Sequence, residues 1–269
     1  MRLFRSNLRK LIRRPATWVT FLLLAALVLL IFVAVTAGAR QATRPAEAIA
    51  AKAVVTFPGA YAAVAGLILG IGGMLAVVYG AAIAGSEWTW GTLKAAVARG
   101  EGRVRYIVMG YLAVVAYVIV GLCLVYLLGV ACAAGGATVL GISLSGMNDS
   151  TALGQVPEEL ARGALALSMD AALGFTIATI ARSQLAGIGV GIGAYFAEGI
   201  AGVFLPDVIK WLPFSAATAV LARSGSVSVG GAQAATSLDP NTAVIVVAAW
   251  LLGALVVSSA WTERAEISG

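Results

Sequence analysis

Long apolar runs separated by short polar segments dominate the chain. A helix that spans lipid needs about 20 consecutive, mainly apolar residues, and six runs reach that length. They predict an all-α integral membrane protein with six transmembrane helices, built as a single transmembrane domain over residues 1–269. The predicted spans are about 18–37, 60–84, 106–131, 160–181, 185–205 and 242–261. The first run exceeds the roughly 7–15 apolar residues of a signal peptide, so we expect it to be retained.

Composition excludes an ordinary soluble fold. Hydrophobic residues make up 61 % of the chain and charged residues only 11 %, whereas a soluble domain is typically about a quarter charged. The chain has no histidine, so the commonest general base and metal ligand is missing. No nucleophile–base pair or metal-ligand cluster stands out either. We therefore expect no intrinsic enzymatic chemistry, no directly bound cofactor and no metal site.

The positions of the basic residues predict the orientation. Six spans place both termini on one side, and inner loops carry an excess of Lys and Arg. With the N-terminus inside, twelve basic residues fall on inner segments and six on outer segments. The inner set is Arg2, Arg5, Arg9, Lys10, Arg13, Arg14, Lys94, Arg99, Arg103, Arg105, Arg182 and Arg264. We expect both termini in the cytoplasm, and an anionic lipid surface, not nucleic acid, as the partner of this charge.

Two segments outside the spans carry helical or apolar patterns. In residues 1–14, apolar side chains recur at helical spacing beside a basic face, which predicts an amphipathic helix lying in the membrane interface, with Pro15 opening the first span. The alternative is a disordered basic leader that only sets the topology. The apolar stretch after Pro206 predicts a short re-entrant or interfacial helix before the last span. Residues 224–241, rich in Gly, Ser and Ala, are expected to form an exposed linker.

The segment between the second and third spans is the most informative. Ser86 and Glu87 resemble a helix N-cap, helix-forming residues follow, and Gly100 ends the pattern, which predicts a short cytosolic helix over 86–100. Trp88, Trp90 and Leu93 would give this helix apolar anchors for a protein partner. The alternative is an interfacial helix whose tryptophans lie among lipid headgroups.

This segment resembles the ABC-2 type transporter permease family. Members carry an acidic residue at the inner end of the second span, then Gly-Thr-Leu, then a helix that ends before an Arg. Here these are Glu87, Gly91-Thr92-Leu93 and Arg103. The basic N-terminal helix, six spans and apolar segment before the last span extend the resemblance over nearly the whole chain. It departs from the family at Gly100-Glu101-Gly102, where members often have Pro, so the helix end is expected to differ.

The resemblance implies a mechanism and partners. The 86–100 segment would be a coupling helix that docks on an ATP-binding subunit, with two such subunits serving two permease copies, as a homodimer or a heterodimer with a related permease. The implied coupling residues are Glu87, Trp88, Trp90, Gly91, Thr92, Leu93 and Arg103. The complex would export a solute across a bacterial or archaeal inner membrane. The chain has no G-x-x-x-x-G-K-[ST] motif, so ATP and Mg²⁺ would be used by the partner subunit.

Two acidic residues lie well inside predicted spans. Asp170 and Glu198 both lie about 18–20 Å from the inner ends of their helices, so they could face one another. Intramembrane acids are candidates for contact with substrate or protons, and the alternative is that they hold helices together through hydrogen bonds. The rival functions are an ion- or proton-coupled carrier or channel that uses these acids without an ATPase, and a membrane scaffold that recruits a partner through 86–100.

Glycines at small-x-x-x-small spacing predict close helix packing within the chain or between two copies. They are Gly66 and Gly70 in the second span, and Gly187, Gly189, Gly191 and Gly193 in the fifth.

Overall fold

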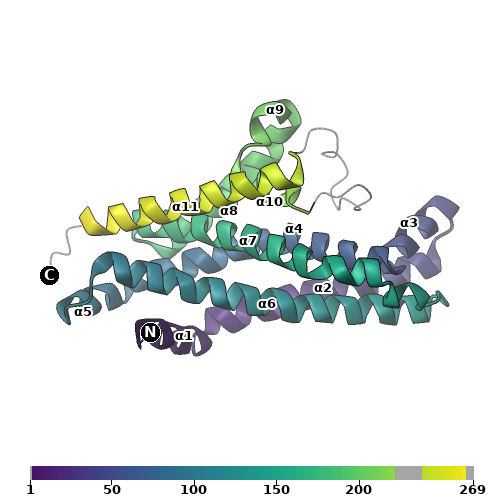
Figure 1. The fold of residues 1–269 in the computed structure, drawn as a ribbon, viewed down its shortest axis with the longest axis horizontal. Coiled ribbons are helices and arrows are strands. Elements are labelled where there is room, and N and C mark those ends of the chain that lie inside the picture. The colour runs from purple at the N-terminus through teal and green to yellow at the C-terminus, as the bar shows by residue number, and fades with distance from the viewer. Residues whose placement is uncertain (1, 222–237, 265–269) are drawn as a thin grey trace.

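The computed structural model describes residues 2–221 and 238–264, and within these it contains helices and turns but no strand (Figure 1). The expected linker over 224–241 lies mostly outside the described residues. The elements are α1 (Arg2–Ile12), α2 (Pro15–Gln41), α3 (Pro45–Val55), α4 (Gly59–Thr89), α5 (Thr92–Ala98), α6 (Arg103–Val139), the 3₁₀ helix η1 (Ser145–Asn148), α7 (Ser150–Ala181), α8 (Gln184–Phe204), α9 (Pro206–Ile209), α10 (Pro213–Ala219) and α11 (Pro240–Arg264).

The prediction of six long apolar helices is confirmed. α2, α4, α6, α7, α8 and α11 are each long and apolar enough to span a membrane. Most extend past their predicted bounds; α7, for example, begins at Ser150 instead of about 160. Its first ten residues mix polar and apolar side chains and form no continuous apolar run. The Asp149 carboxylate accepts hydrogen bonds from the backbone N–H groups of Thr151 and Ala152 and so fixes the earlier start.

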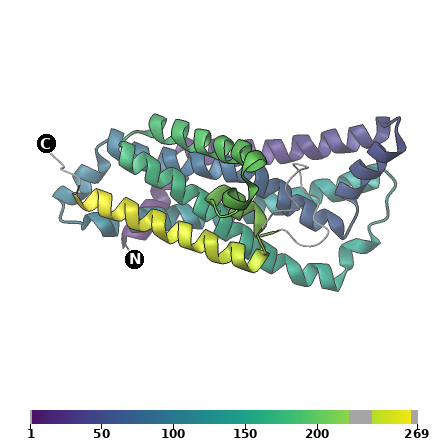
Figure 2. The same cartoon turned by 90° about the horizontal axis from the view of Figure 1, so that it is seen from above.

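The long helices run roughly along a common axis, and α9, α10 and the start of α11 lie near the middle of its length (Figures 1 and 2). At one end lie α1, α5 and the C-terminal end of α11; at the other lie α3 and η1. The sequence predicted no helix at α3. An even number of spans accounts for α1 and the end of α11 lying together. Which end faces the cytoplasm stays a prediction from the distribution of basic residues.

α4 and α7 form the centre of the bundle. Most positions along the apolar windows of both helices are buried, whereas few positions along those of α2, α8 and α11 are buried. The two central backbones touch: a Cβ added at Gly80 would collide with the Ala171 carbonyl, and one added at Gly174 would collide with the Val77 carbonyl. Only glycine allows the helices to approach this closely.

The predicted glycine contacts are correct at some positions only. Within this chain, Gly187 packs against the backbone of Ala178, and Gly191 faces the Val77 side chain. At the remaining positions an added Cβ would meet no described atom beyond its own helix backbone within 4 Å. Those positions are Gly66, Gly70, Gly189 and Gly193. Their packing between two copies of the chain stays a prediction.

The two segments flanking the spans are helical. α1 packs along α6 with Leu11 buried, and Pro15 begins α2 as expected. The single short helix predicted before the last span is two helices, α9 and α10, because Pro213 starts a new one. Phe214 and Ala216 of α10 are buried against the bundle. The interfacial and re-entrant assignments stay predictions.

Candidate functional site

The helical structure is interrupted between α4 and α5, at Trp90-Gly91. α4 continues to Thr89, and α5 begins only at Thr92. Gly91 adopts φ +63°, a left-handed conformation that ends α4 at little cost for glycine. The prediction of one helix over 86–100 is therefore wrong about where that helix begins: residues 86–89 belong to α4. The Ser86 hydroxyl is no N-cap, because it donates to the Ile83 carbonyl within α4, 2.8 Å away.

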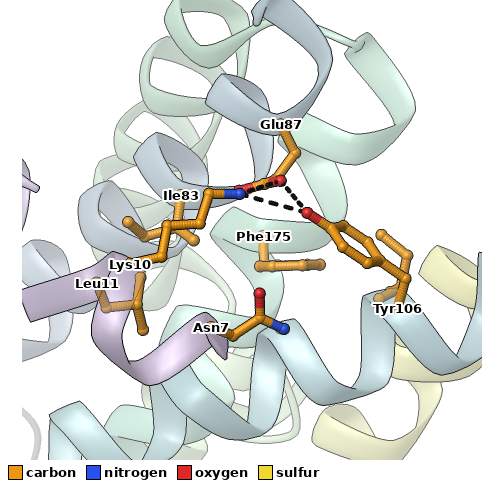
Figure 3. A pocket seen from close by; sticks show the side chains of 9 residues that line it. Asn7, Lys10, Leu11, Ile83, Glu87, Tyr106 and Phe175 are labelled. Atoms are coloured by element: carbon orange, nitrogen blue, oxygen red, sulfur yellow. Dashed lines mark hydrogen bonds and ion pairs between the residues drawn. The ribbon is translucent and has the colours of Figure 1, made fainter. Parts of the chain in front are cut away.

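The Glu87 carboxylate is the centre of a buried polar network. Its Oε1 accepts hydrogen bonds from Lys10 Nζ and Arg14 Nη2, each at 2.6 Å. Its Oε2 accepts from Lys10 Nζ at 2.7 Å, and from the hydroxyls of Thr92 and Tyr106 at 2.5 Å each. Figure 3 shows Lys10 and Tyr106 converging on Glu87 from opposite sides. We call these five residues the Glu87 network; it joins α1, α4, α5 and α6.

The network combines one carboxylate with two cations. A buried ion pair offsets the loss of hydration only when further hydrogen bonds satisfy its polar atoms, and the two hydroxyls supply these bonds to Glu87. Burial lowers the pKa of the Lys10 ammonium from its ordinary value, while the Glu87 carboxylate opposes that shift. We infer that Lys10 remains a cation here because its Nζ contacts both carboxylate oxygens.

Two tryptophans extend the network to neighbouring helices. Arg14, which is buried, also donates from Nη1 to the Ser86 hydroxyl at 2.7 Å, and its guanidinium lies 5.1 Å from the Trp90 ring centre. The Arg182 guanidinium, at the end of α7, lies 5.2 Å from the Trp88 ring centre. These are cation–π distances. The α4–α5 break is thus connected to the ends of α1 and α7.

α5 is held against α6 by its apolar side. Leu93 and Ala96 are buried in a small cluster with Tyr106. The expectation that Leu93 is an anchor free to meet a partner is therefore corrected: the chain's own helices already bury it. Glu87 likewise has its basic partners within the chain. Trp90, by contrast, is 63 % exposed.

Four exposed residues of this region lie at the end of α4 and along α5. They are Trp90, Lys94, Ala95 and Ala98; we call them the α5 surface. Arg103, the other residue implied by the resemblance, begins α6 and donates from Nη1 to the Glu263 carbonyl of α11 at 3.0 Å. The structure therefore brings Glu87, Trp88, Thr92 and Leu93 together, and places Arg103 against a different helix.

A cavity of about 20 Å³ lies beside Glu87 (Figure 3). Asn7, Lys10, Leu11 and Tyr106 are among its lining residues, and Asn7 Nδ2 is buried without a hydrogen-bond partner among the described residues. A water molecule needs roughly 10–15 Å³ of such volume. The cavity fits one water and is too small for a transported solute.

The second candidate site is formed by the intramembrane acids, both of which are buried. Glu198 Oε1 accepts a hydrogen bond from the backbone N–H of Ser215 in α10 at 2.5 Å. Asp170 Oδ1 has no hydrogen-bond partner among the described residues. The helix-packing interpretation therefore has direct support at Glu198, whereas Asp170 lacks such a bond.

Lys10, Arg14 and Tyr106 were not predicted from the sequence as partners of Glu87. Their signal was present: Arg14 directly precedes Pro15, and Lys10 lies one helical turn before it, so both occupy the junction that enters the first span. If that junction packs against the second span, both cations are buried there and need an acidic partner on the second span.

Among the described residues, no group of three or more His, Cys, Asp or Glu side chains is placed to hold a metal ion. No protein-family model matches the chain, and no curated protein matches it.

Proposed function

We propose that the chain is the membrane subunit of an ATP-driven exporter of the ABC-2 permease type. The observation that carries the proposal is the Glu87 network, because it links the short helix after the second span to α1, to the start of the first span at Arg14, and to the second and third spans. A load applied to α5 would reach α1, α4 and α6 through buried charged contacts. Such contacts resist separation, since breaking them leaves unpaired charge in a poorly hydrated site.

In this proposal the partner binds the α5 surface, not the buried face. Trp90 supplies an exposed aromatic side chain beside three residues of α5, and exposed tryptophans are frequent anchors in protein interfaces. Two ATP-binding subunits would bind two copies of this chain, and ATP and Mg²⁺ would act on those subunits. Their closure would move α5 and the helices attached to it.

The test is recovery of the ATP-binding partner from native membranes in mild detergent. A tagged chain should retain a P-loop ATPase in equal amount, two copies of each. Ala95→Glu adds a charged side chain in the middle of the α5 surface and should reduce the recovered ATPase about tenfold or more, the loss expected for disruption of an interface anchor region.

Ala46→Glu is the matched control. Ala46 is exposed on α3, at the opposite end of the bundle from α5 (Figure 1), so this variant should retain the ATPase at the level of the unmodified chain. Recovery of the permease without an ATPase from the unmodified protein would count against the proposal. Equal recovery of the ATPase with both variants would show that α5 is not part of the interface.

A second candidate function, an ion- or proton-coupled carrier without an ATPase, is favoured by the buried, unpartnered Asp170. A transport assay with the purified protein in liposomes distinguishes the two functions. A carrier should move solute along an imposed ion or proton gradient with no ATP and no second subunit, whereas the ABC-type subunit should be inactive under those conditions.

A further inference from the structure

Asp170 lies in the interior of the bundle on α7, with 2 % of its surface exposed. Its Oδ2 points at the α4 backbone, because a Cβ added at Gly73 would lie 2.8 Å from it. Its Oδ1 is buried without a hydrogen-bond partner among the described residues. An ionised carboxylate needs donors or a cation to offset its lost hydration, and at Oδ1 neither is provided.

Among the described residues, the helices around Asp170 offer no nearby cation. α4, α8 and α10 contain no Lys or Arg. On α7 itself, Arg162 lies eight residues earlier, about 12 Å along the axis, and pairs with Glu158 and Asn241. Arg182 lies twelve residues later, about 18 Å away, over the Trp88 ring.

The charged residues of the other two neighbouring helices are also distant. α11 is level with Thr176 at Ala254, where the Thr176 hydroxyl donates to the Ala254 carbonyl. Its charged residues Glu263 and Arg264 are therefore about 20 Å from Asp170 along the helix axes. α6 carries its two Arg residues in its first turn.

The titratable groups that face Asp170 are two tyrosines and a second acid. Tyr111 of α6 donates its hydroxyl to the Ser168 carbonyl at 2.6 Å. Tyr195 of α8 donates to the Gly70 carbonyl at 2.9 Å. Both phenolic protons are therefore directed to backbone carbonyls and not to Asp170. Glu198 lies one turn after Tyr195 and interacts electrostatically with Asp170.

The two acids have different surroundings. Glu198 accepts the Ser215 N–H, which favours its charged form. Asp170 has no such donor at Oδ1 and interacts electrostatically with Glu198, and two neighbouring buried carboxylates do not both ionise readily. We propose that Asp170 and Glu198 form a proton-binding site, in which Asp170 holds one proton as a neutral carboxylic acid and Glu198 carries the negative charge.

The site couples proton binding to the position of α10. Ser215 belongs to α10, so a movement of α10 that withdraws its N–H would remove the donor that stabilises the Glu198 carboxylate. Glu198 would then take up a second proton. This inference does not rest on the ATPase partner, and its failure would leave the proposed transport function unchanged.

Infrared spectroscopy of the purified full-length chain in liposomes tests the proposal without a substitution. A protonated carboxylic acid gives a carbonyl band that a carboxylate lacks, and ¹³C in the aspartate side-chain carboxyl shifts that band. The other three aspartates, Asp149, Asp207 and Asp239, are exposed, so a label-sensitive buried-acid band at neutral pH reports Asp170. The expected result is one such band at neutral pH, which decreases as the pH is raised.

Two isosteric variants complete the assignment. Asp170→Asn should remove the label-sensitive band, whereas Glu198→Gln should lower the pH at which the band is lost, because it removes the neighbouring negative charge. A spectrum with no label-sensitive band at neutral pH would overturn the proposal, as would a band that survives Asp170→Asn or one whose pH dependence is unchanged in Glu198→Gln. If a variant fails to insert, the labelled spectrum of the unmodified chain still decides whether Asp170 is protonated.

Discussion

Arg14 and Glu87 form a buried ion pair across 73 positions of sequence, with Arg14 Nη2 lying 2.6 Å from Glu87 Oε1. Only 7 % and 10 % of the two side chains are exposed. The pair fixes the junction between α1 and α2 against the last turn of α4. It therefore determines where the chain enters its first span relative to where it leaves its second.

Glu87→Gln should destabilise the protein by about 3 kcal/mol, the lower end of the cost of removing one partner from a buried ion pair. The lower end applies because Lys10 is 30 % exposed and water can reach it. Arg14 would keep its bond to the Ser86 hydroxyl but lose its counter-charge. The expected measurement is a lower Tm in detergent by thermal unfolding.

Glu47→Gln is the control for that loss of charge. Glu47 pairs with Arg44 on the surface of α3, where both side chains are more than half exposed. Exposed pairs of this kind contribute at most about 1 kcal/mol, so Tm should hardly change. Equal effects of the two substitutions would show that the Glu87 network contributes no more than a surface pair.

Tyr106→Phe tests the hydrogen bonds of the same network. It removes the hydroxyl that donates to Glu87 Oε2 at 2.5 Å, and hydrogen bonds to charged groups contribute about 1.5–3 kcal/mol. Tyr126→Phe on the same helix is the matched change, because the buried Tyr126 hydroxyl has no hydrogen-bond partner among the described residues. The first variant should unfold at lower temperature and the second should be unchanged or more stable. The reverse order would contradict the described hydrogen bonding.

The sequence predicted the six spans because an apolar run of sufficient length has few alternatives to a membrane helix. It did not predict the break at Trp90-Gly91. Ser86 has the character of an N-cap residue, but the same hydroxyl can bond to a carbonyl one turn earlier within a helix. Which of these occurs depends on Arg14 and Lys10, which pack against this turn from a segment more than 70 positions away.

The site formed by Asp170 and Glu198 was predicted only in part, because some of its contacts depend on the tertiary fold. Asp170 and Glu198 were predicted to lie at a similar depth within their helices, because helix rise alone sets that depth. The bond from Ser215 to Glu198 was not predictable, since it depends on how α10 folds back onto α8. The close approach of α4 and α7 at Gly80 was also not predicted, because a chain with 32 glycines offers many equivalent small-residue spacings.

The last prediction concerns the centre of the bundle, where α4 and α7 meet. Gly80→Ala would place a methyl group against the Ala171 carbonyl. Because the obstacle is backbone, no side chain can rotate away, and the two helices must separate along their contact. We expect a loss near the upper end of the ~1–3 kcal/mol typical of overpacking, seen as a lower Tm in detergent. Gly135→Ala on α6 is the control: its added methyl meets no described atom within 4 Å, and alanine favours a helix over glycine by about 1 kcal/mol. Gly135→Ala should therefore keep or raise Tm. A Gly80→Ala variant as stable as Gly135→Ala would show that α4 and α7 do not pack backbone to backbone, and the central contact of the bundle would have to be placed elsewhere.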